Sequence, residues 1–271
     1  MIVETIRGQE VPALGFGTWD LNGEACVEGT QHALSLGYRH IDTAQGYGNE
    51  AEVGRGLKNS GVSREDIFLV TKLKPSNFSE DRALSTTRES LEKLGAGYVD
   101  LLLLHWPNPD VPVGETLGAL NQFVEEGSVR HVGVSNFTPS LVEEAEQHAE
   151  IFANQVEYHP YLSQDKLIRQ AKSRGYLLTA YSPIAKGKVM DDETLKEIGE
   201  AHGKSPVQVC LRWLVQQEQV AAIPKASSAA HRESNFGIFD FELSGEEMER
   251  IYSLRREERI VDPAGGPDWE R

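Results

Sequence analysis

Short apolar runs alternate with longer amphipathic segments along most of the chain. Runs of this length are typical of buried strands, and the segments between them have the periodicity of helices. Eight strands that alternate with helices predict an α/β fold with a parallel sheet, closed into a (β/α)8 TIM barrel. The predicted strands are Tyr38–Asp42, Ile67–Lys72, Val99–His105, His131–Ser135, Phe152–Val156, Leu177–Tyr181, Val220–Ile223 and Phe239–Phe241.

Capping residues indicate where three of the helices begin. Thr138-Pro139 and Ser205-Pro206 each combine a helix N-cap with a proline at the first helical position. The segment that follows Ser244 resembles a capping box, so the last helix is expected to start there.

The two ends of the chain lie outside this repeating pattern. Residues 1–15 predict a β-hairpin that turns at Gly8, and a short C-terminal tail ends near Trp269. No linker or low-complexity stretch divides the chain, and a barrel of about 250 residues accommodates its length. Residues 1–271 are therefore expected to form one domain.

The charge of the chain narrows the choice of partners. Its 27 Lys and Arg against 42 Asp and Glu give a net charge of −15, which repels nucleic acids and anionic membranes. No segment approaches the roughly 18 apolar residues of a membrane span, and the first residues are too charged for a signal peptide. Cys26 and Cys210 are expected to be reduced packing residues. We therefore expect a cytoplasmic protein, monomeric because nothing indicates an obligate interface.

Four ionisable side chains lie at the ends of three predicted strands. Asp42 ends one strand and Tyr47 follows it. Lys72 and His105 end the next two strands. Because the carboxyl ends of barrel strands converge on one mouth, these side chains are expected to meet there, where barrels carry out their chemistry.

Together, these four groups predict proton delivery to a carbonyl compound. A free tyrosine has a pKa near ~10, which is high for a general acid at neutral pH. Lys72 is expected to lower the pKa of Tyr47, and Asp42 to keep Lys72 charged. His105 is expected to donate a hydrogen bond to the carbonyl oxygen. Alternatively, Asp42 and Lys72 form only a structural ion pair.

The pattern around these residues resembles the aldo-keto reductase family over nearly the whole chain. The resemblance implies that Asp42, Tyr47, Lys72 and His105 are the catalytic tetrad of an NAD(P)H-dependent carbonyl reductase with no metal. It also implies that the barrel itself binds the nicotinamide dinucleotide, and the chain has no GxGxxG motif. The matching segments are Gly37-Tyr38-Arg39-His40-Ile41-Asp42-Thr43-Ala44, Tyr47, Gly48-Asn49-Glu50, Val53-Gly54, Val134-Ser135-Asn136-Phe137 and Ile223-Pro224-Lys225.

The same resemblance implies a set of cofactor-binding residues. Ser135, Asn136 and Gln155 match residues that bind the carboxamide, and Tyr181 matches the ring that stacks on the nicotinamide. Small residues and Lys186 suit the pyrophosphate. The other implied positions are Gly17, Thr18 and Trp19 near the ribose, Ser182, Pro183, Ile184 and Gly187 over the pyrophosphate, and Lys225, Ala226, Ser227, His231 and Asn235 near the adenosine phosphate and adenine.

The substrate pocket is expected to contain Trp19, Trp106, Trp269 and Phe78, with Lys74 where the family usually has an aromatic residue. An ammonium there would favour polar or anionic carbonyl compounds, unless the side chain points to solvent. The tail resembles that of short bacterial members, which include 2,5-diketo-D-gluconate reductases and reductases of methylglyoxal. A small dicarbonyl or a keto-sugar acid is therefore the expected substrate.

Three further departures from the family pattern lie near the adenosine positions. His231 stands where arginine is usual, Ala226 where serine is usual, and Ser234 where glutamate is usual. Arginine clamps a 2′-phosphate with a permanently charged planar group, which histidine lacks. NADPH is therefore expected to be preferred only modestly, with NADH also used.

Two other functions are compatible with this sequence. Lys72 could form a Schiff base with a carbonyl substrate, as in a lyase, although Asp42 should keep it protonated. Some proteins that resemble the family bind the cofactor and regulate a partner instead of catalysing a reaction. The intact set of four ionisable residues favours catalysis over this regulatory role.

Overall fold

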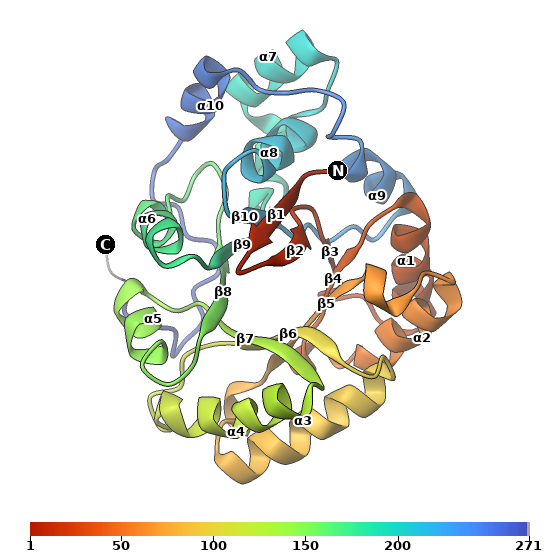
Figure 1. Cartoon of the computed structure of the whole chain (residues 1–271). Coiled ribbons are helices and arrows are strands. Elements are labelled where there is room, and N and C mark those ends of the chain that lie inside the picture. The colour runs from red at the N-terminus through yellow and green to blue at the C-terminus, as the bar shows by residue number, and fades with distance from the viewer. Residues whose placement is uncertain (270–271) are drawn as a thin grey trace.

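The structure is a computed structural model and describes residues 1–269. Eight parallel strands, each paired with the next along the chain, form a sheet ringed by helices (Figure 1). Leu14 bridges Ala222 and Gly17 bridges Lys225, so the first and last strands meet and the predicted (β/α)8 barrel is closed. The strands are β3 (Phe16–Gly17), β4 (His40–Asp42), β5 (Phe68–Leu73), β6 (Val99–Leu104), β7 (Val129–Ser135), β8 (Ile151–Glu157), β9 (Leu177–Tyr181) and β10 (Val220–Ala222).

The helices lie outside the strands, and the three predicted starts are confirmed. Helix α5 begins at Pro139 and α8 at Pro206. Ser205 and Ser244 each form a capping box at the start of their helix. The α-helices are α1 (Gly23–Leu36), α2 (Glu50–Ser60), α3 (Glu80–Leu94), α4 (Val113–Glu126), α5 (Pro139–Ala145), α6 (Asp165–Arg174), α7 (Glu193–His202), α8 (Pro206–Val215), α9 (Ala229–Phe236) and α10 (Gly245–Tyr252), and the short 3₁₀ helices are η1 (Gln45–Tyr47), η2 (Arg64–Asp66), η3 (Pro75–Asn77) and η4 (Ala185–Asp191).

One predicted strand was wrong, and the strand that replaces it was missed. Residues 239–241 form no strand, because their aromatic rings pack between helices. The Phe239 ring lies 5.6 Å from that of Phe236, and the Phe241 ring lies 5.3 Å from that of His202. The eighth barrel strand is instead β3, which has only two residues and so gives no apolar run.

Close backbone approach explains why glycine is used in β3. A Cβ on Gly17 would lie 2.8 Å from the carbonyl oxygen of Ile223, at the seam where β3 meets the last strand. Only glycine allows that approach without a shift of the backbone. The seam of the barrel therefore depends on a missing side chain, which hydrophobic patterns do not reveal.

The predicted N-terminal hairpin is present and lies across one end of the barrel (Figure 1). It consists of β1 (Val3–Ile6) and β2 (Gln9–Pro12) and turns at Arg7 and Gly8, both with positive φ. Two positive φ values suit the twist of a two-residue hairpin. Ile6 packs into the interior of the barrel, so the hairpin closes the end at which the strands begin.

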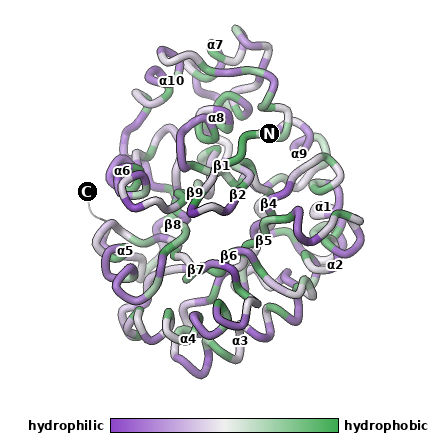
Figure 2. Tube along the Cα trace, viewed as in Figure 1, coloured by the Kyte–Doolittle hydropathy of each residue, from purple (hydrophilic) through white to green (hydrophobic). Residues whose placement is uncertain are grey.

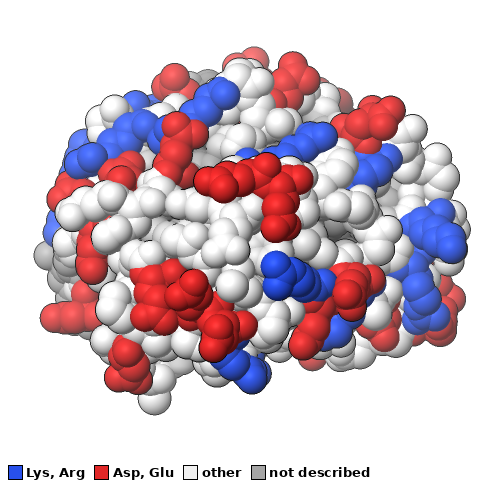
Figure 3. All heavy atoms as spheres, turned by 60° about the horizontal axis from the view of Figure 1, so that its bottom comes forward, with Lys and Arg blue, Asp and Glu red and all other residues white. Residues whose placement is uncertain are grey.

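The distribution of apolar residues follows from this arrangement. Every residue of β5, β6 and β8 is buried, and along the helices hydrophobic and hydrophilic residues alternate (Figure 2). Cys26 and Cys210 are buried and free, as expected. On the face shown in Figure 3, acidic side chains gather in several groups with basic ones between them. Among residues 1–269, no helix is both long enough and apolar enough to cross a membrane.

Two glycine substitutions in helices should change stability in opposite directions. A Cβ on Gly54 in α2 would overlap the carbonyl oxygen of Leu94, whereas one on Gly118 in α4 meets no atom within 4 Å. We expect Gly54→Ala to lower the free energy of unfolding by about 1–3 kcal/mol. Gly118→Ala should raise it by about 0.5–1 kcal/mol, because alanine restricts the unfolded chain. Urea unfolding of both variants measures this, and equal effects would contradict it.

Candidate active site

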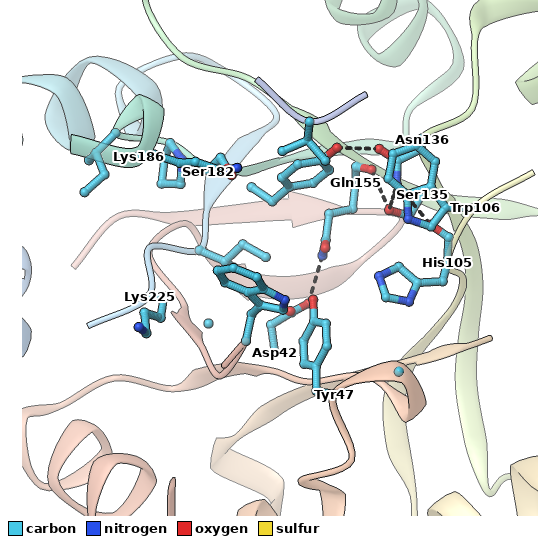
Figure 4. Close-up of a pocket in the computed structure, with 18 residues that line it drawn as sticks. Asp42, Tyr47, His105, Trp106, Ser135, Asn136, Gln155, Ser182, Lys186 and Lys225 are labelled. Carbon is cyan, nitrogen blue, oxygen red and sulfur yellow. Dashed lines mark hydrogen bonds between the residues drawn. The ribbon is translucent and has the colours of Figure 1, made fainter. Parts of the chain in front are cut away.

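A cavity of about 470 Å³ opens where the barrel strands end (Figure 4). Asp42, Tyr47 and His105 line it, and Lys72 lies fully buried beside them. The structure therefore brings together the four side chains that the sequence placed at strand ends. Within residues 1–269, no group of three or more His, Cys, Asp or Glu side chains is arranged to hold a metal ion.

Lys72 is the centre of the polar contacts at this end of the barrel. Its ammonium donates hydrogen bonds to Asp42 Oδ1 at 2.5 Å, to the Thr43 carbonyl oxygen at 2.8 Å and to Tyr47 Oη at 3.3 Å. An ammonium has three N–H bonds, so all of its donors are used. The charge is therefore fixed in position and directed at the Tyr47 hydroxyl.

The protonation state of Lys72 follows from its neighbours. Burial lowers the pKa of Lys72, but the Asp42 carboxylate and the Tyr47 side chain outweigh burial and raise the pKa above its ordinary value. A Schiff base requires an unprotonated amine. This environment therefore disfavours Lys72 as the nucleophile of a lyase.

Tyr47 departs from expectation in one respect. Burial raises its pKa, and the nearby Lys72 charge opposes this rise without cancelling it. The expectation that the pKa of Tyr47 would fall below its free value is therefore wrong for the net shift, although Lys72 acts in the expected direction. As a result, Tyr47 is a protonated phenol at neutral pH and has a proton to donate.

The His105 ring faces Tyr47 across the cavity (Figure 4). Their ring centroids lie 5.7 Å apart at an angle of 76°. Burial, together with the Lys72 charge, lowers the pKa of His105 to about 3. The imidazole is therefore neutral at neutral pH, and one of its ring nitrogens can donate a hydrogen bond without introducing a charge.

A chain of hydrogen bonds extends from this group along the cavity wall. Gln155 Nε2 donates to Asp42 Oδ2 at 2.8 Å, and Ser135 Oγ donates to the Gln155 carbonyl oxygen at 2.8 Å. Asn136 adopts a left-handed φ of 64°, which asparagine tolerates, and its Oδ1 accepts from Tyr181 Oη at 2.7 Å. Hydroxyl and amide groups thus lie beside a flat aromatic ring, an arrangement that fits a nicotinamide with its carboxamide.

The segment after β9 has an unusual backbone. Ser182, Ala185 and Lys186 have φ values of 47°, 49° and 51°, a conformation that is uncommon for residues other than glycine. Ser182, Lys186 and Lys225 all line the cavity (Figure 4). Two cations beside a strained loop fit the phosphates of a dinucleotide, because such strain is commonly kept at ligand sites.

Most of the predicted cofactor residues line the cavity. Those that do are Gly17, Trp19, Ser135, Asn136, Gln155, Tyr181, Ser182, Pro183, Ile184, Lys186 and Lys225. Six do not: Thr18, Gly187, Ala226, Ser227, His231 and Asn235. Thr18 is fully buried, and its hydroxyl donates to the Asp42 carbonyl oxygen. His231 is exposed in the first turn of α9.

Only some of the residues predicted for the substrate pocket line the cavity. Trp19 and Trp106 line the cavity, but Lys74, Phe78 and Trp269 do not. Lys74 precedes η3 and is exposed to solvent, and Phe78 is buried in the core between strands and helices. Trp269 packs edge-on against Trp106, with ring centroids 6.2 Å apart, and so contacts the pocket only indirectly.

Three cavity residues were missed by the sequence interpretation. Gly46 follows β4, Ile223 follows β10, and Val261 belongs to the C-terminal tail. Gly46 directly precedes Tyr47, and Ile223 lies two residues before Lys225, so their places near these residues were the available signal. Val261 gave none, because the path of the tail across the barrel is set by contacts distant in sequence.

Comparison with known proteins agrees with this geometry. Residues 13–256 match the model of the aldo/keto reductase family. The chain is similar to glyoxal reductase of Bacillus subtilis (41% identical, covering 95% of this chain and 94% of the relative) and to methylglyoxal reductase DkgB of Escherichia coli (39%, covering 96% and 99%). A crystal structure named for 2,5-diketo-D-gluconic acid reductase B superposes with a TM-score of 0.97 at 48% identity, covering 99% of this chain and 97% of that one.

The environment of His105 predicts its behaviour on titration. Its NMR signals should not titrate between pH 8 and pH 5, whereas an unstructured histidine peptide titrates near ~6.5. Because the folded protein binds this proton less readily than the unfolded chain, His105 makes stability fall as pH drops below the unfolded pKa. Between pH 7 and pH 5, the parent should therefore lose up to about 2 kcal/mol more stability than His105→Gln. Titration of the His105 signals near pH 6.5 would contradict this.

Proposed function

The chain belongs to the aldo/keto reductase family, and we propose that it reduces small aldehydes and ketones to alcohols with Tyr47 as the proton donor. Family membership makes it an NAD(P)H-dependent oxidoreductase that reduces carbonyl groups. The contact that carries the proposal for Tyr47 is the Lys72 hydrogen bond, which fixes the phenol hydroxyl at the cavity surface opposite His105.

The proposed roles of the side chains follow from these contacts. When bound, the reduced nicotinamide supplies the hydride that is added to the carbonyl carbon. Tyr47 gives its hydroxyl proton to the carbonyl oxygen, and Lys72 stabilises the phenolate that remains. Asp42 balances the Lys72 charge throughout. Neutral His105 donates a hydrogen bond to the same oxygen and orients the carbonyl group.

The cofactor-binding residues are proposed from the shape and chemistry of the cavity. Ser135, Asn136 and Gln155 would hold the carboxamide, and the Tyr181 ring would stack on the nicotinamide. Lys186 and Lys225 would neutralise phosphate groups, which an otherwise acidic protein must bind with local cations. The other predicted cofactor positions remain part of this proposal.

The proposed substrates are small, polar dicarbonyl compounds, with a keto-sugar acid as a larger alternative. The similarity to glyoxal and methylglyoxal reductases supports the first class. The cavity of about 470 Å³ includes both the proposed nicotinamide wall and the Tyr47 hydroxyl, so only part of it is left for a substrate. The exposed Lys74 gives no further support for an anionic substrate.

An assay of carbonyl compounds with NADPH and with NADH tests this function. We expect turnover of glyoxal and methylglyoxal, and Tyr47→Phe should lower kcat by roughly 100-fold or more, the range for a lost general acid. The Tyr47→Phe protein should still bind the cofactor, because the ring is kept. Lys72→Met should also lower kcat severely, since burial then raises the pKa of Tyr47 unopposed.

The expected fall in kcat of Tyr47→Phe can be distinguished from a loss of folding. Circular dichroism and cofactor titration should match the parent for Tyr47→Phe. If this variant keeps most of its turnover in an assay limited by chemistry, Tyr47 is not the proton donor. If the parent reduces none of the carbonyl compounds, the proposed reaction itself fails.

The identity of residue 231 should influence the choice of cofactor. His231 is exposed in the first turn of α9, six residues after Lys225 in the proposed adenosine region. Arginine would add a permanent planar cation for a 2′-phosphate. One such charge-assisted hydrogen bond corresponds to roughly 10- to 150-fold in affinity. We expect His231→Arg to tighten NADPH by about that factor and leave NADH nearly unchanged, as parallel fluorescence titrations would show. Equal tightening of both cofactors would contradict the assignment.

A further inference from the structure

A buried carboxylate at the end of β8 has no part in the chemistry proposed above. Glu157 is fully buried, at 0 % exposure. It lies two residues after Gln155, so both side chains point to the same face of the strand. Gln155 contacts Asp42, and Glu157 therefore lies one step further towards the mouth of the barrel.

Three donors surround the Glu157 carboxylate. His159 Nε2 lies 2.9 Å from Oε1, and the Tyr161 N–H donates to His159 Nδ1, which leaves the ring proton on Nε2. The other two donors are backbone N–H groups of the C-terminal tail (residues 255–269). Ile260 N donates to Oε1 at 2.7 Å, and Val261 N donates to Oε2 at 2.8 Å.

These contacts make the tail and the carboxylate depend on each other. A buried carboxylate is costly unless it is hydrogen-bonded, and here two of its donors belong to the tail. A carboxylate accepts at both oxygens, whereas the amide of glutamine has only one acceptor and presents N–H donors at its other end. Glutamine at position 157 would thus keep the shape of the side chain but could not accept both backbone hydrogen bonds from the tail.

A neighbouring contact continues the same attachment. The carbonyl oxygen of Tyr161 accepts from the backbone N–H groups of Arg256 at 3.2 Å and Glu258 at 2.9 Å. The tail is therefore held by its backbone from residue 256 to residue 261. The last of these contacts is the hydrogen bond from Val261 N to Glu157, and Val261 itself lines the cavity.

We propose that Glu157 is a positioning residue for substrate selectivity: its carboxylate holds the Val261 segment of the tail as a fixed wall of the substrate cavity. The fixed wall restricts the cavity to short carbonyl compounds. This inference rests on the proposed carbonyl reduction and extends it, because it names the group that sets the size limit. Glu157 itself contacts neither the Tyr47 hydroxyl nor any other reacting atom.

The test compares glyoxal with hexanal, using NADPH, in the parent and in Glu157→Gln. Releasing the wall should raise the hexanal-to-glyoxal ratio of kcat/KM by about tenfold or more, the lower range for relief of a crowded apolar pocket. The change should come from a lower KM for hexanal, with kcat for glyoxal and the NADPH affinity kept. A residue with only a structural role would lower stability without moving this ratio.

Limited trypsin digestion provides a readout that does not depend on activity. Arg255, Arg256 and Arg259 lie in the tail, so a released tail should be cut at these sites while the barrel stays intact. The matched control is Glu257→Gln, the same chemical change on an exposed tail residue. This control should keep the tryptic pattern and the substrate ratio of the parent.

Val261→Ala shortens the side chain that lines the cavity and keeps the backbone hydrogen bonds between the tail and Glu157. It should raise the hexanal-to-glyoxal ratio while leaving the tail resistant to trypsin. A folded Glu157→Gln protein with the ratio and digestion pattern of the parent would overturn the proposal. If Glu157→Gln does not fold, an unchanged ratio in Val261→Ala overturns it alone. If the parent reduces neither aldehyde, the reductase function has failed, and the tryptic comparison still shows whether Glu157 holds the tail.

Discussion

The arrangement of the site depends on one buried ion pair, between Lys72 on β5 and Asp42 on β4. The two side chains are almost fully buried, at 0% and 1% exposure, so each charge requires the other. Removal of one partner from such a pair typically costs about 3–5 kcal/mol, because the remaining charge is left buried and uncompensated. Gln155 on β8 donates to the Asp42 carboxylate, so side chains from three strands meet at this pair, and Thr18 after β3 donates to the backbone carbonyl oxygen of Asp42.

The same charge sets the protonation of its neighbours. Lys72 contributes to the low pKa of His105 and opposes the rise that burial causes in the pKa of Tyr47. A neutral imidazole and a protonated phenol therefore face each other at neutral pH. This combination provides two hydrogen-bond donors without a net charge at the cavity surface, which suits a neutral carbonyl group.

Much of the fold and the centre of the site could be predicted from the sequence, because both depend on local patterns. Apolar runs and capping residues located most strands and three helix starts, and strand ends located Asp42, Lys72 and His105. The two-residue strand β3 escaped prediction, because it depends on glycines that allow backbones to approach. The aromatic alternation at Phe239–Phe241 suggested a strand, but it packs helices together. Val261 and the net pKa of Tyr47 depend on tertiary burial, and no local pattern reports that.

The closure of the barrel has a consequence for how the chain folds. Leu14 pairs with Ala222 and Gly17 with Lys225, so the two strands that complete the ring come from opposite ends of the barrel sequence. Contacts of such large sequence separation form slowly, because the intervening loop loses much entropy when its ends meet. During synthesis, β3 can pair with β4 at once, but its other edge stays unpaired until the last strand is made. A nascent chain of this protein is therefore vulnerable to wrong pairing until residue 225 has left the ribosome.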